Sequence, residues 1–256
     1  MKTSKNIGII VFTKVPISGF VKTRLHHPQL DENYITDLQT AMLKDTLLIL
    51  ERVPKNFVPI LSFFPEEKAE TLEKLIIHPL QPLYPEFFER VHIVPQRGID
   101  VTERFSNIFS FTFNELNLNS SIIIGSDTPH LQPKLITKCI DYLQKNSKAA
   151  VLGPSQNGGF YILGHTQPYI HDIGSVFKKS SSTGELGNVM ELLVSNNFEV
   201  TILPEVTDVD TFDNLKTVRA IIKLLSFTSY ETKDYYFPKF TKNILDMFND
   251  SFWLKS

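Results

Sequence analysis

Three consecutive isoleucines, Ile122 to Ile124, constrain the fold more than any other stretch of the chain. A short, uninterrupted apolar run of this kind is typical of a strand buried on both faces at the centre of a parallel sheet. Gly125 follows, and Asp127 comes where the apolar run has stopped. Open α/β sheets bind ligands at the carboxyl ends of their strands. The stretch therefore predicts either a carboxylate at the ligand-binding edge or an Asp that only caps the next turn.

Length and composition limit the class of protein. The chain has 256 residues, enough for one large α/β domain or two small ones, and a net charge of -2. That charge argues against a general nucleic-acid binder, and the single Cys139 excludes an internal disulfide and a cysteine-rich zinc site. The sequence has no apolar run of about 18 residues, and Met1 to Lys5 lack the pattern of a signal peptide. We therefore expect a cytoplasmic protein without a membrane segment.

A basic loop follows the first predicted strand, Ile7 to Phe12. It carries Lys14, Gly19, Lys22 and Arg24. Backbone N–H groups and cationic side chains that converge after a strand are suited to binding phosphate groups. The glycine spacing matches neither the P-loop nor the Rossmann motif. The loop indicates either a diphosphate or triphosphate site or a solvated basic surface.

Polar residues also follow the predicted strand Val91 to Val94. Gln96 and Gly98 lie in the loop, at an edge where they could sit beside a nucleotide base. Arg104 comes slightly later and could reach a phosphate. For Arg104 we favour the simpler interpretation, a surface pair with a carboxylate close to it in the sequence.

Asn157-Gly158-Gly159 separates two apolar runs and is a strong signal for a tight turn. A hairpin is the simplest interpretation. Alternatively, the two glycines let the backbone press against a substrate. Residues 165–184 look irregular and end in a serine-rich stretch, a pattern that fits a lid and a plain surface loop equally well.

Two aspartates, Asp208 and Asp210, alternate after the predicted strand Phe198 to Leu203. In an extended backbone, residues two apart point the same way, so both carboxylates share one face. A divalent cation removes the repulsion between them. We predict metal binding for at least Asp210, and we interpret Thr211 and Asp213 as caps of the next helix.

Strands and helices alternate as far as residue 225, which predicts one α/β domain over residues 1–226 with a mostly parallel sheet. In the first helical pattern, Asp31 to Arg52, Asp45 falls on the apolar stripe and is interpreted as a buried structural carboxylate. The proline-rich residues 78–85 are predicted to form a loop. An aromatic-rich helical extension over residues 227–256 is expected to pack on the domain, or on a second subunit.

Four motifs occur in a fixed order along the chain. They are Lys14-Val-Pro-x-x-Gly19-x-x-Lys22-Thr23-Arg24-Leu25, Gly125-Ser126-Asp127-Thr128-Pro129, Gly153-Pro154-x-x-Asn157-Gly158-Gly159-Phe160-Tyr161 and Asp208-Val-Asp210-Thr211. This order resembles the bacterial and archaeal transferases called radical-SAM/selenodomain-associated transferase 1, a glycosyltransferase-A-type group. It is similar more distantly to the 2-phospholactate and molybdenum-cofactor guanylyltransferases. The resemblance covers about residues 6–225.

The resemblance implies a single-domain, Rossmann-like nucleotide-diphospho-sugar transferase (GT-A) fold and a nucleotide-bound substrate with Mg²⁺ or Mn²⁺. It implies phosphate contacts for Lys14, Lys22 and Arg24, a catalytic metal held by Asp127 and Asp210, and an acceptor or sugar pocket lined by Gly158 and Gly159. From the residue patterns, Gly19, Gln96 and Gly98 join the expected nucleotide site, and Asp208 joins the expected metal site.

The chain departs from the family pattern at two places. Asn157 stands where the family usually has Asp, and the loss of charge puts a role as base or metal ligand there in doubt. The segment from Gln96 to Val101 matches the family's Asp-Leu-Gly-Glu-Arg pattern only loosely. The motifs identify no general base, since isolated histidines such as His130 and His165 are more often structural.

Three functions remain open from the sequence. Slightly favoured is a glycosyltransferase that moves a sugar from a sugar nucleotide to a small-molecule acceptor. The second is a nucleotidyltransferase that uses an NTP, and the third is a non-catalytic nucleotide-binding protein. The expected partners are a nucleotide sugar or NTP and a small acceptor, without nucleic acid or membrane, and the expected assembly is a monomer or a homodimer.

Overall fold

A seven-stranded sheet organises the molecule in the computed structural model, which describes residues 7–25, 27–54, 56–178, 184–228 and 235–254. The strands are β1 (Ile7–Lys14), β2 (Val58–Phe64), β3 (His92–Pro95), β4 (Ser120–Gly125), β5 (Ala149–Pro154), β6 (Phe160–Thr166) and β7 (Glu199–Ile202). Their order across the sheet is β3-β2-β1-β4-β6-β5-β7. Strand β6 runs antiparallel to β4 and β5, and the other paired strands are parallel. The predicted mostly parallel α/β sheet is confirmed.

The isoleucine run forms β4 as its pattern predicts. β4 pairs with β1 on one side and with β6 on the other, and its isoleucines are almost completely buried. Successive side chains of a strand point to opposite faces. Ile122 and Ile124 therefore pack with α1 and α6, whereas Ile123 packs with α5 and α7.

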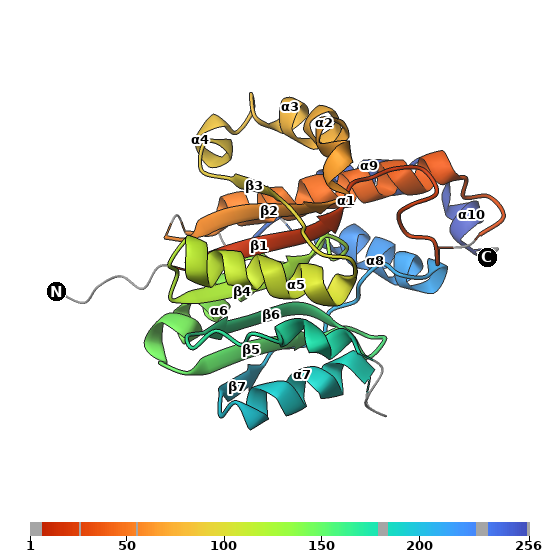
Figure 1. The fold of residues 1–256 in the computed structure, drawn as a ribbon. Helices are drawn as coiled ribbons and strands as arrows, with labels where there is room; N and C mark the ends of the chain where they lie inside the picture. Colours follow the sequence, from red (N-terminus) through yellow and green to blue (C-terminus); the bar gives the residue numbers. More distant parts are fainter. Residues whose placement is uncertain (1–6, 26, 55, 179–183, 229–234, 255–256) are drawn as a thin grey trace.

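Helices cover both faces of the sheet (Figure 1). One face carries α1 (Glu32–Arg52) and α6 (Pro133–Lys145), and the other carries α5 (Val101–Ser110) and α7 (Gly184–Ser195). The remaining helices are α2 (Ala69–Leu72), α3 (His78–Leu80), α4 (Pro85–Phe88), α8 (Phe212–Leu225), α9 (Lys239–Leu245) and α10 (Asp250–Leu254). Single 3-10 or π turns, η1 to η4, occupy Glu66–Lys68, Glu73–Ile77, Phe111–Glu115 and Ile173–Phe177.

The C-terminal helices pack back on the start of the domain. Figure 1 shows α9 lying along α1, with α10 beyond it near α8. A third apolar cluster joins α1, α8 and the two tail helices, with Leu38, Leu215, Leu245 and Trp253 among its buried members. This cluster fixes the tail to the helices that flank the ligand edge of the sheet.

Asp45 ties the tail to α1, and its predicted structural role is confirmed. The wholly buried carboxylate accepts hydrogen bonds from the Tyr236 hydroxyl at 2.7 Å, from the Thr241 backbone N–H at 2.7 Å and hydroxyl at 2.6 Å, and from the Phe240 N–H at 3.3 Å. Burial raises the pKa of Asp45 to about 6, although these hydrogen bonds oppose the shift. Hydrogen-bond donors from the tail therefore offset the cost of burying this carboxylate on the apolar face of α1.

Some local expectations were wrong. Residues 78–85 are not a loop throughout, because helical backbone continues from η2 into α3 and resumes in α4. Thr211 caps α8 by accepting from the Asn214 N–H, whereas Asp213 lies inside the first turn. Within residues 165–184, β6 extends to Thr166 and η4 follows, while residues 179–183 lie outside the described part of the chain. The structure thus leaves the lid hypothesis untested.

No helix in the described part of the chain is long and apolar enough to cross a membrane.

Candidate functional site

Acidic and basic side chains meet at the carboxyl ends of β1 and β4. The Lys22 ammonium lies 2.8 Å from Asp127 Oδ2 and 3.8 Å from Asp210 Oδ1. Arg24 Nη1 lies 3.2 Å from Asp210 Oδ2. The backbone N–H of Val209 donates to the Asp127 carbonyl at 3.0 Å, which fastens the segment after β7 to the loop after β4. Three of the four sequence motifs are thereby brought into one site.

The basic loop after β1 adopts an unusual backbone conformation. Gly19 has φ 72° and Lys22 has φ 49°, and for a lysine the left-handed region is uncommon. Two turns shape the loop, with the Phe20 N–H bonded to the Ile17 carbonyl and the Leu25 N–H bonded to the Lys22 carbonyl. The Lys22 side chain is only 9% exposed, so the loop buries a cation against the two carboxylates. Strained backbone at such a place is a marker of a functional site.

The turn after β4 places Gly125 against the Asp127 carboxylate. A Cβ on Gly125 would lie 2.7 Å from Asp127 Oδ1. The Ser126 hydroxyl is held by the Thr13 hydroxyl at 2.8 Å and by the Gln39 amide nitrogen at 2.9 Å. Gly125 and Ser126 therefore set the position from which Asp127 reaches Lys22.

Asp208 completes a group of three neighbouring aspartates. Its Oδ1 is buried and has no hydrogen-bond partner among the described residues. Burial and the nearby charges of Asp127 and Asp210 together raise the pKa of Asp208 to about 6, with Lys22 opposing the shift. Within the described residues, Asp208 thus feels the charge of Lys22 but forms no ion pair.

The aspartates could supply part of the ligands of a Mg²⁺ or Mn²⁺ ion if a bound phosphate supplied others. In the described part of the chain, no group of three His, Cys, Asp or Glu side chains is disposed to enclose a metal by itself. Mg²⁺ in phosphate-using enzymes is commonly held by one or two carboxylates, with phosphate and water oxygens completing the shell. Asp127 and Asp210 are placed to supply such carboxylates, and the unpartnered oxygen of Asp208 lies beside them.

Lys14 and Arg104 add positive charge beside this site, and neither forms an ion pair with a described residue. Burial lowers the pKa of Lys14, and the charges of Arg104 and Lys22 lower it further. Arg104 was expected in a surface pair with Asp100 or Glu103, and that expectation was wrong. Its guanidinium lies over the Phe64 ring, 3.9 Å from the centroid, while Asp100 caps α5. An anion between Lys14 and Arg104 would relieve their mutual repulsion.

Gln96 and Gly98 have structural roles in the loop between β3 and α5. The Gln96 amide nitrogen donates to the carbonyls of Thr13 at 2.9 Å and Ser62 at 3.0 Å, which ties the ends of β1 and β2 together. Gly98 has φ 137°, and a Cβ there would lie 2.6 Å from Glu103 Cβ. A contact between either residue and a nucleotide base stays a prediction.

A cavity of about 560 Å³ opens next to the aspartates, and the glycine turn forms part of its wall. The turn joins β5 to β6 as the predicted hairpin, with the Ser155 N–H bonded to the Gly159 carbonyl at 2.9 Å. Residues from four separate segments line the cavity, including Arg24, Gly158, Gly159, Glu185, Asp208 and Asp210. The turn therefore faces the same space as the charged groups.

Asn157 lies in the wall of this cavity and contacts α8. Its side-chain nitrogen lies 3.5 Å from Asn214 Oδ1, and the Asn214 nitrogen donates to Gln156 Oε1 at 3.2 Å. Asn214 also caps α8 together with Thr211. The amide of Asn157 thus joins a network that attaches the glycine turn to α8.

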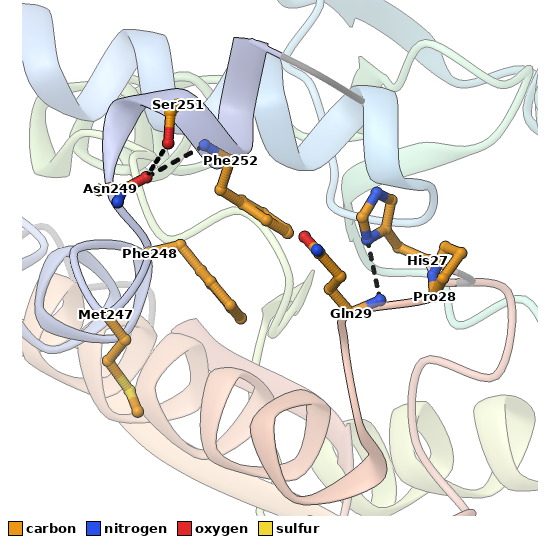
Figure 2. Close-up of a pocket in the computed structure, with 8 residues that line it drawn as sticks. All are labelled: His27, Pro28, Gln29, Met247, Phe248, Asn249, Ser251 and Phe252. Atoms are coloured by element: carbon orange, nitrogen blue, oxygen red, sulfur yellow. Dashed lines mark hydrogen bonds between the residues drawn. The ribbon is translucent and has the colours of Figure 1, made fainter.

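A second cavity, about 720 Å³, lies between the loop His27–Gln29 and the tail (Figure 2). The tail contributes Met247, Phe248 and Phe252, and the two phenyl rings stack 4.1 Å apart. Figure 2 also shows His27 Nδ1 accepting from the Gln29 backbone N–H. No Asp, Glu, Lys or Arg is among the described residues that line it, so it offers no charged group for a phosphate or metal.

The two histidines near the motifs are buried, as their isolated positions predicted. Burial lowers the pKa of His130 and that of His165 to about 4 in each case. His165 stacks on Phe113 with 4.8 Å between ring centroids, and its Nδ1 lies 2.8 Å from the Thr166 carbonyl. Neither histidine is among the described residues that line the 560 Å³ cavity.

Residues 60–180 match a family described as "Uncharacterized protein conserved in bacteria (DUF2064)". This span contains Asp127 and the glycine turn, but not the basic loop or Asp210. A search of curated proteins found no match. Membership of the radical-SAM/selenodomain-associated transferases stays a prediction.

Solved structures share the fold over nearly the whole chain. A "putative nucleotide-diphospho-sugar transferase" from Desulfovibrio desulfuricans G20 is 23% identical with a TM-score of 0.76, and the match covers 98% of this chain and 97% of that one. A cytidylyltransferase from Leptospira borgpetersenii serovar Hardjo-bovis (strain JB197) is 12% identical with a TM-score of 0.53, covering 94% of each chain. A CMP:2-keto-3-deoxy-manno-octonic acid synthetase complexed with CTP is 10% identical with a TM-score of 0.52, covering 86% of this chain and 99% of that one. The predicted nucleotide-diphospho-sugar transferase type of fold is confirmed.

Proposed function

We propose that this protein is a metal-dependent transferase that takes the transferred group from a nucleotide-activated donor. The observation that carries the proposal is the placement of Lys22 between Asp127 and Asp210 at the carboxyl ends of β1 and β4. Lys14 and Arg104 add positive charge beside it. A reaction with a diphosphate or pyrophosphate leaving group requires carboxylates that hold a divalent ion and cations that bind the phosphates.

The fold supports a nucleotide as the donor. Ligands of open α/β sheets bind at the carboxyl ends of the strands, where these charged groups lie. The structures of similar fold include a protein described as a nucleotide-diphospho-sugar transferase and a synthetase complexed with CTP. A donor with two or three phosphates would place its anionic chain along Lys14, Lys22 and Arg24, and its divalent ion against Asp127 and Asp210.

Glycosyl transfer is the form of the reaction that we propose first. An acceptor oxygen would bond to the anomeric carbon of the sugar as the bond to the nucleoside diphosphate breaks. The negative charge that develops on the leaving diphosphate would be stabilised by Lys22 and Arg24, and a bound Mg²⁺ or Mn²⁺ would neutralise the rest. The similarity to the D. desulfuricans protein, which spans nearly the whole of both chains, favours this form.

Nucleotidyl transfer is the second candidate, and the gathering of Lys14, Lys22 and Arg104 favours it. Three cations suit a triphosphate. The acceptor would then attack the α-phosphorus, and pyrophosphate would leave. The cytidylyltransferase of similar fold adds weight to this candidate.

A thermal-shift panel with Mg²⁺ or Mn²⁺ tests the proposal and separates the two reactions. A ligand that binds only the folded protein raises the melting temperature by mass action. The panel compares ATP, CTP, GTP and UTP with UDP-glucose, GDP-mannose and related sugar nucleotides. We expect stabilisation that depends on the metal and that is lost in Asp127→Asn.

The outcome of the panel chooses between the hypotheses. Stabilisation by one sugar nucleotide supports glycosyl transfer and names the donor. Stabilisation by one NTP alone supports nucleotidyl transfer. If no ligand of the panel raises the melting temperature of the wild-type protein with metal present, both reactions are contradicted. The protein would then have the fold of these enzymes without their activity.

A further inference from the structure

Glu185 contributes a carboxylate to the lining of the 560 Å³ cavity. It lies in the first turn of α7, and its Oε2 is 3.7 Å from the position of a Cβ built on Gly159. The Leu186 backbone N–H donates to the Gly158 carbonyl at 3.1 Å. This hydrogen bond docks the start of α7 on the glycine turn and holds Glu185 at the wall of the cavity.

The Glu185 carboxylate is not committed to another side chain. Within the described residues it forms no hydrogen bond or ion pair. By contrast, Asp127 and Asp210 are both paired with Lys22, and Asp210 is also paired with Arg24. Among the described residues, Glu185 and Asp208 are therefore the lining carboxylates with an oxygen free of side-chain partners, and Asp208 lies with the proposed metal ligands, which leaves Glu185 to interact with an acceptor.

The surroundings of Glu185 favour proton uptake. Partial burial of its carboxyl raises the pKa of Glu185, although the residue as a whole is exposed, and the charge of Asp210 raises it further, while Arg24 opposes the shift. A carboxylate whose pKa is raised toward neutral pH is a better base for a hydroxyl proton than an ordinary surface carboxylate.

We propose that Glu185 is the general base of the transferase and that the cavity takes a small, uncharged acceptor with a hydroxyl group. The inference rests on the proposed function. The acceptor oxygen forms a bond to the donor carbon or phosphorus, the bond to the diphosphate or pyrophosphate leaving group breaks, and the hydroxyl proton passes to the Glu185 carboxylate. The electron pair of the broken bond leaves with the phosphate group.

The described side chains that line the cavity carry three negative charges against two positive ones, which disfavours an anionic acceptor. Carboxylates from Glu185, Asp208 and Asp210 face the space, against cations from Arg24 and Lys178. Arg24 is already paired with Asp210. A phosphate or carboxylate acceptor would meet net negative charge, whereas a neutral hydroxyl compound would not. The phenyl rings of Phe160 and Phe177 supply apolar wall for its carbon skeleton.

The test compares the wild type with Glu185→Gln, Glu185→Asp and Glu191→Gln. Glu191 is exposed on the same helix and does not line the cavity, so its variant matches the loss of charge without touching the site. Binding of the nucleotides in the thermal-shift panel is measured by calorimetry with Mn²⁺. Turnover is measured as release of nucleoside diphosphate or pyrophosphate with glycerol and glucose as neutral acceptors, and with glycerol 3-phosphate as an anionic one.

We expect Glu185→Gln to bind nucleotide as the wild type does, within about 3-fold, and to lose about 100-fold or more in kcat with the neutral acceptors. Glu185→Asp should keep part of the turnover and the acidic limb of the pH profile, which Glu185→Gln should lack. Glu191→Gln should match the wild type in every measurement.

Two results would overturn the assignment while leaving the proposed function intact. One is nucleotide binding with unchanged turnover in Glu185→Gln, and the other is preferential transfer to glycerol 3-phosphate. A wild-type protein that binds no nucleotide would instead overturn the proposed function, and the role of Glu185 with it.

Discussion

Lys22 Nζ lies 2.8 Å from Asp127 Oδ2, although 105 residues separate the two in the sequence. The contact joins the loop after β1 to the loop after β4, the two strands at the centre of the sheet. An ammonium group there balances carboxylate charge that a divalent ion would also balance. On binding a metal–nucleotide complex, we expect Lys22 to exchange the carboxylate for a phosphate oxygen.

Lys22→Met should weaken the binding of nucleoside triphosphates or diphosphates by about 10- to 100-fold, since charge-assisted hydrogen bonds contribute about 1.5–3 kcal/mol. Binding of the corresponding nucleoside should not change, because it has no phosphate for the ammonium to contact. Calorimetric titration of both ligands checks the difference. Lys134→Met, on an exposed position of α6, is the matched control. Equal losses for nucleotide and nucleoside would count against a phosphate contact.

Gly125→Ala should damage the site more than the fold. The new Cβ would lie 2.7 Å from Asp127 Oδ1, so the carboxylate must move, and we expect metal-dependent nucleotide affinity to fall at least 10-fold. Gly158→Ala provides the contrast, because its Cβ meets nothing within 4 Å but its φ of 75° disfavours alanine. That variant should lose about 1 kcal/mol of stability. Urea denaturation and Mn²⁺-dependent nucleotide titration measure the two effects separately.

Asp208→Asn should stabilise the protein at pH 7.5 and have little effect near pH 4. The pKa of Asp208 is about 6 in the folded protein, against about 3.9 in an unfolded chain. Above pH 6 the folded state must therefore hold an ionised carboxylate that its surroundings disfavour, and this cost disappears as pH falls toward 4. Allowing for solvent screening of a partly exposed group, the gain at pH 7.5 should be about 1 kcal/mol. Urea denaturation of both proteins at the two pH values checks it, and an equal gain at both would contradict the account.

Asp45→Ala should destabilise the whole domain, since it leaves the Tyr236 and Thr241 donors buried without an acceptor. We expect a loss of about 3 kcal/mol, whereas Tyr236→Phe, which removes one donor, should cost about 1 kcal/mol. The two are compared by thermal denaturation. If Tyr236→Phe cost as much as Asp45→Ala, the hydrogen-bond explanation would fail.

The carboxyl ends of the strands could be predicted because apolar runs and the polar residues after them have distinct local patterns. Asp127 at the end of β4, the hairpin at Gly158 and the buried Asp45 all follow from this local information. Thr211 and Asp213 were both interpreted as caps, because either residue type can cap a helix, and in the structure the cap is Thr211. Only the position of Asn214 decides it, by completing a capping box.

Other features depend on tertiary contacts that no short segment encodes. The hydrogen bonds by which the Gln96 amide joins β1 and β2 could not be predicted, because the Thr13 and Ser62 carbonyls lie far from it in the sequence. Glu185 was missed because α7 reaches the site only through its docking on Gly158. Pro79 contributed to the incorrect prediction of a loop over residues 78–85, where the structure is partly helical. The wide π turn η2 before it, with the His78 N–H bonded to the Glu73 carbonyl, accommodates a proline that would interrupt an ordinary helix.

Because β6 is antiparallel, the edge of the sheet at the carboxyl ends of the parallel strands has two parts, which differ in how well they tolerate sequence changes. Lys22 and Asp127 follow strands whose pairing on both sides fixes their ends. Between β5 and β6 the chain reaches the same edge as a turn, and turns accept new lengths and sequences at small thermodynamic cost. Under the proposed function, evolution or design could therefore change the acceptor by replacing the turn and the start of α7, while the charged groups around Lys22 and Asp127 are kept.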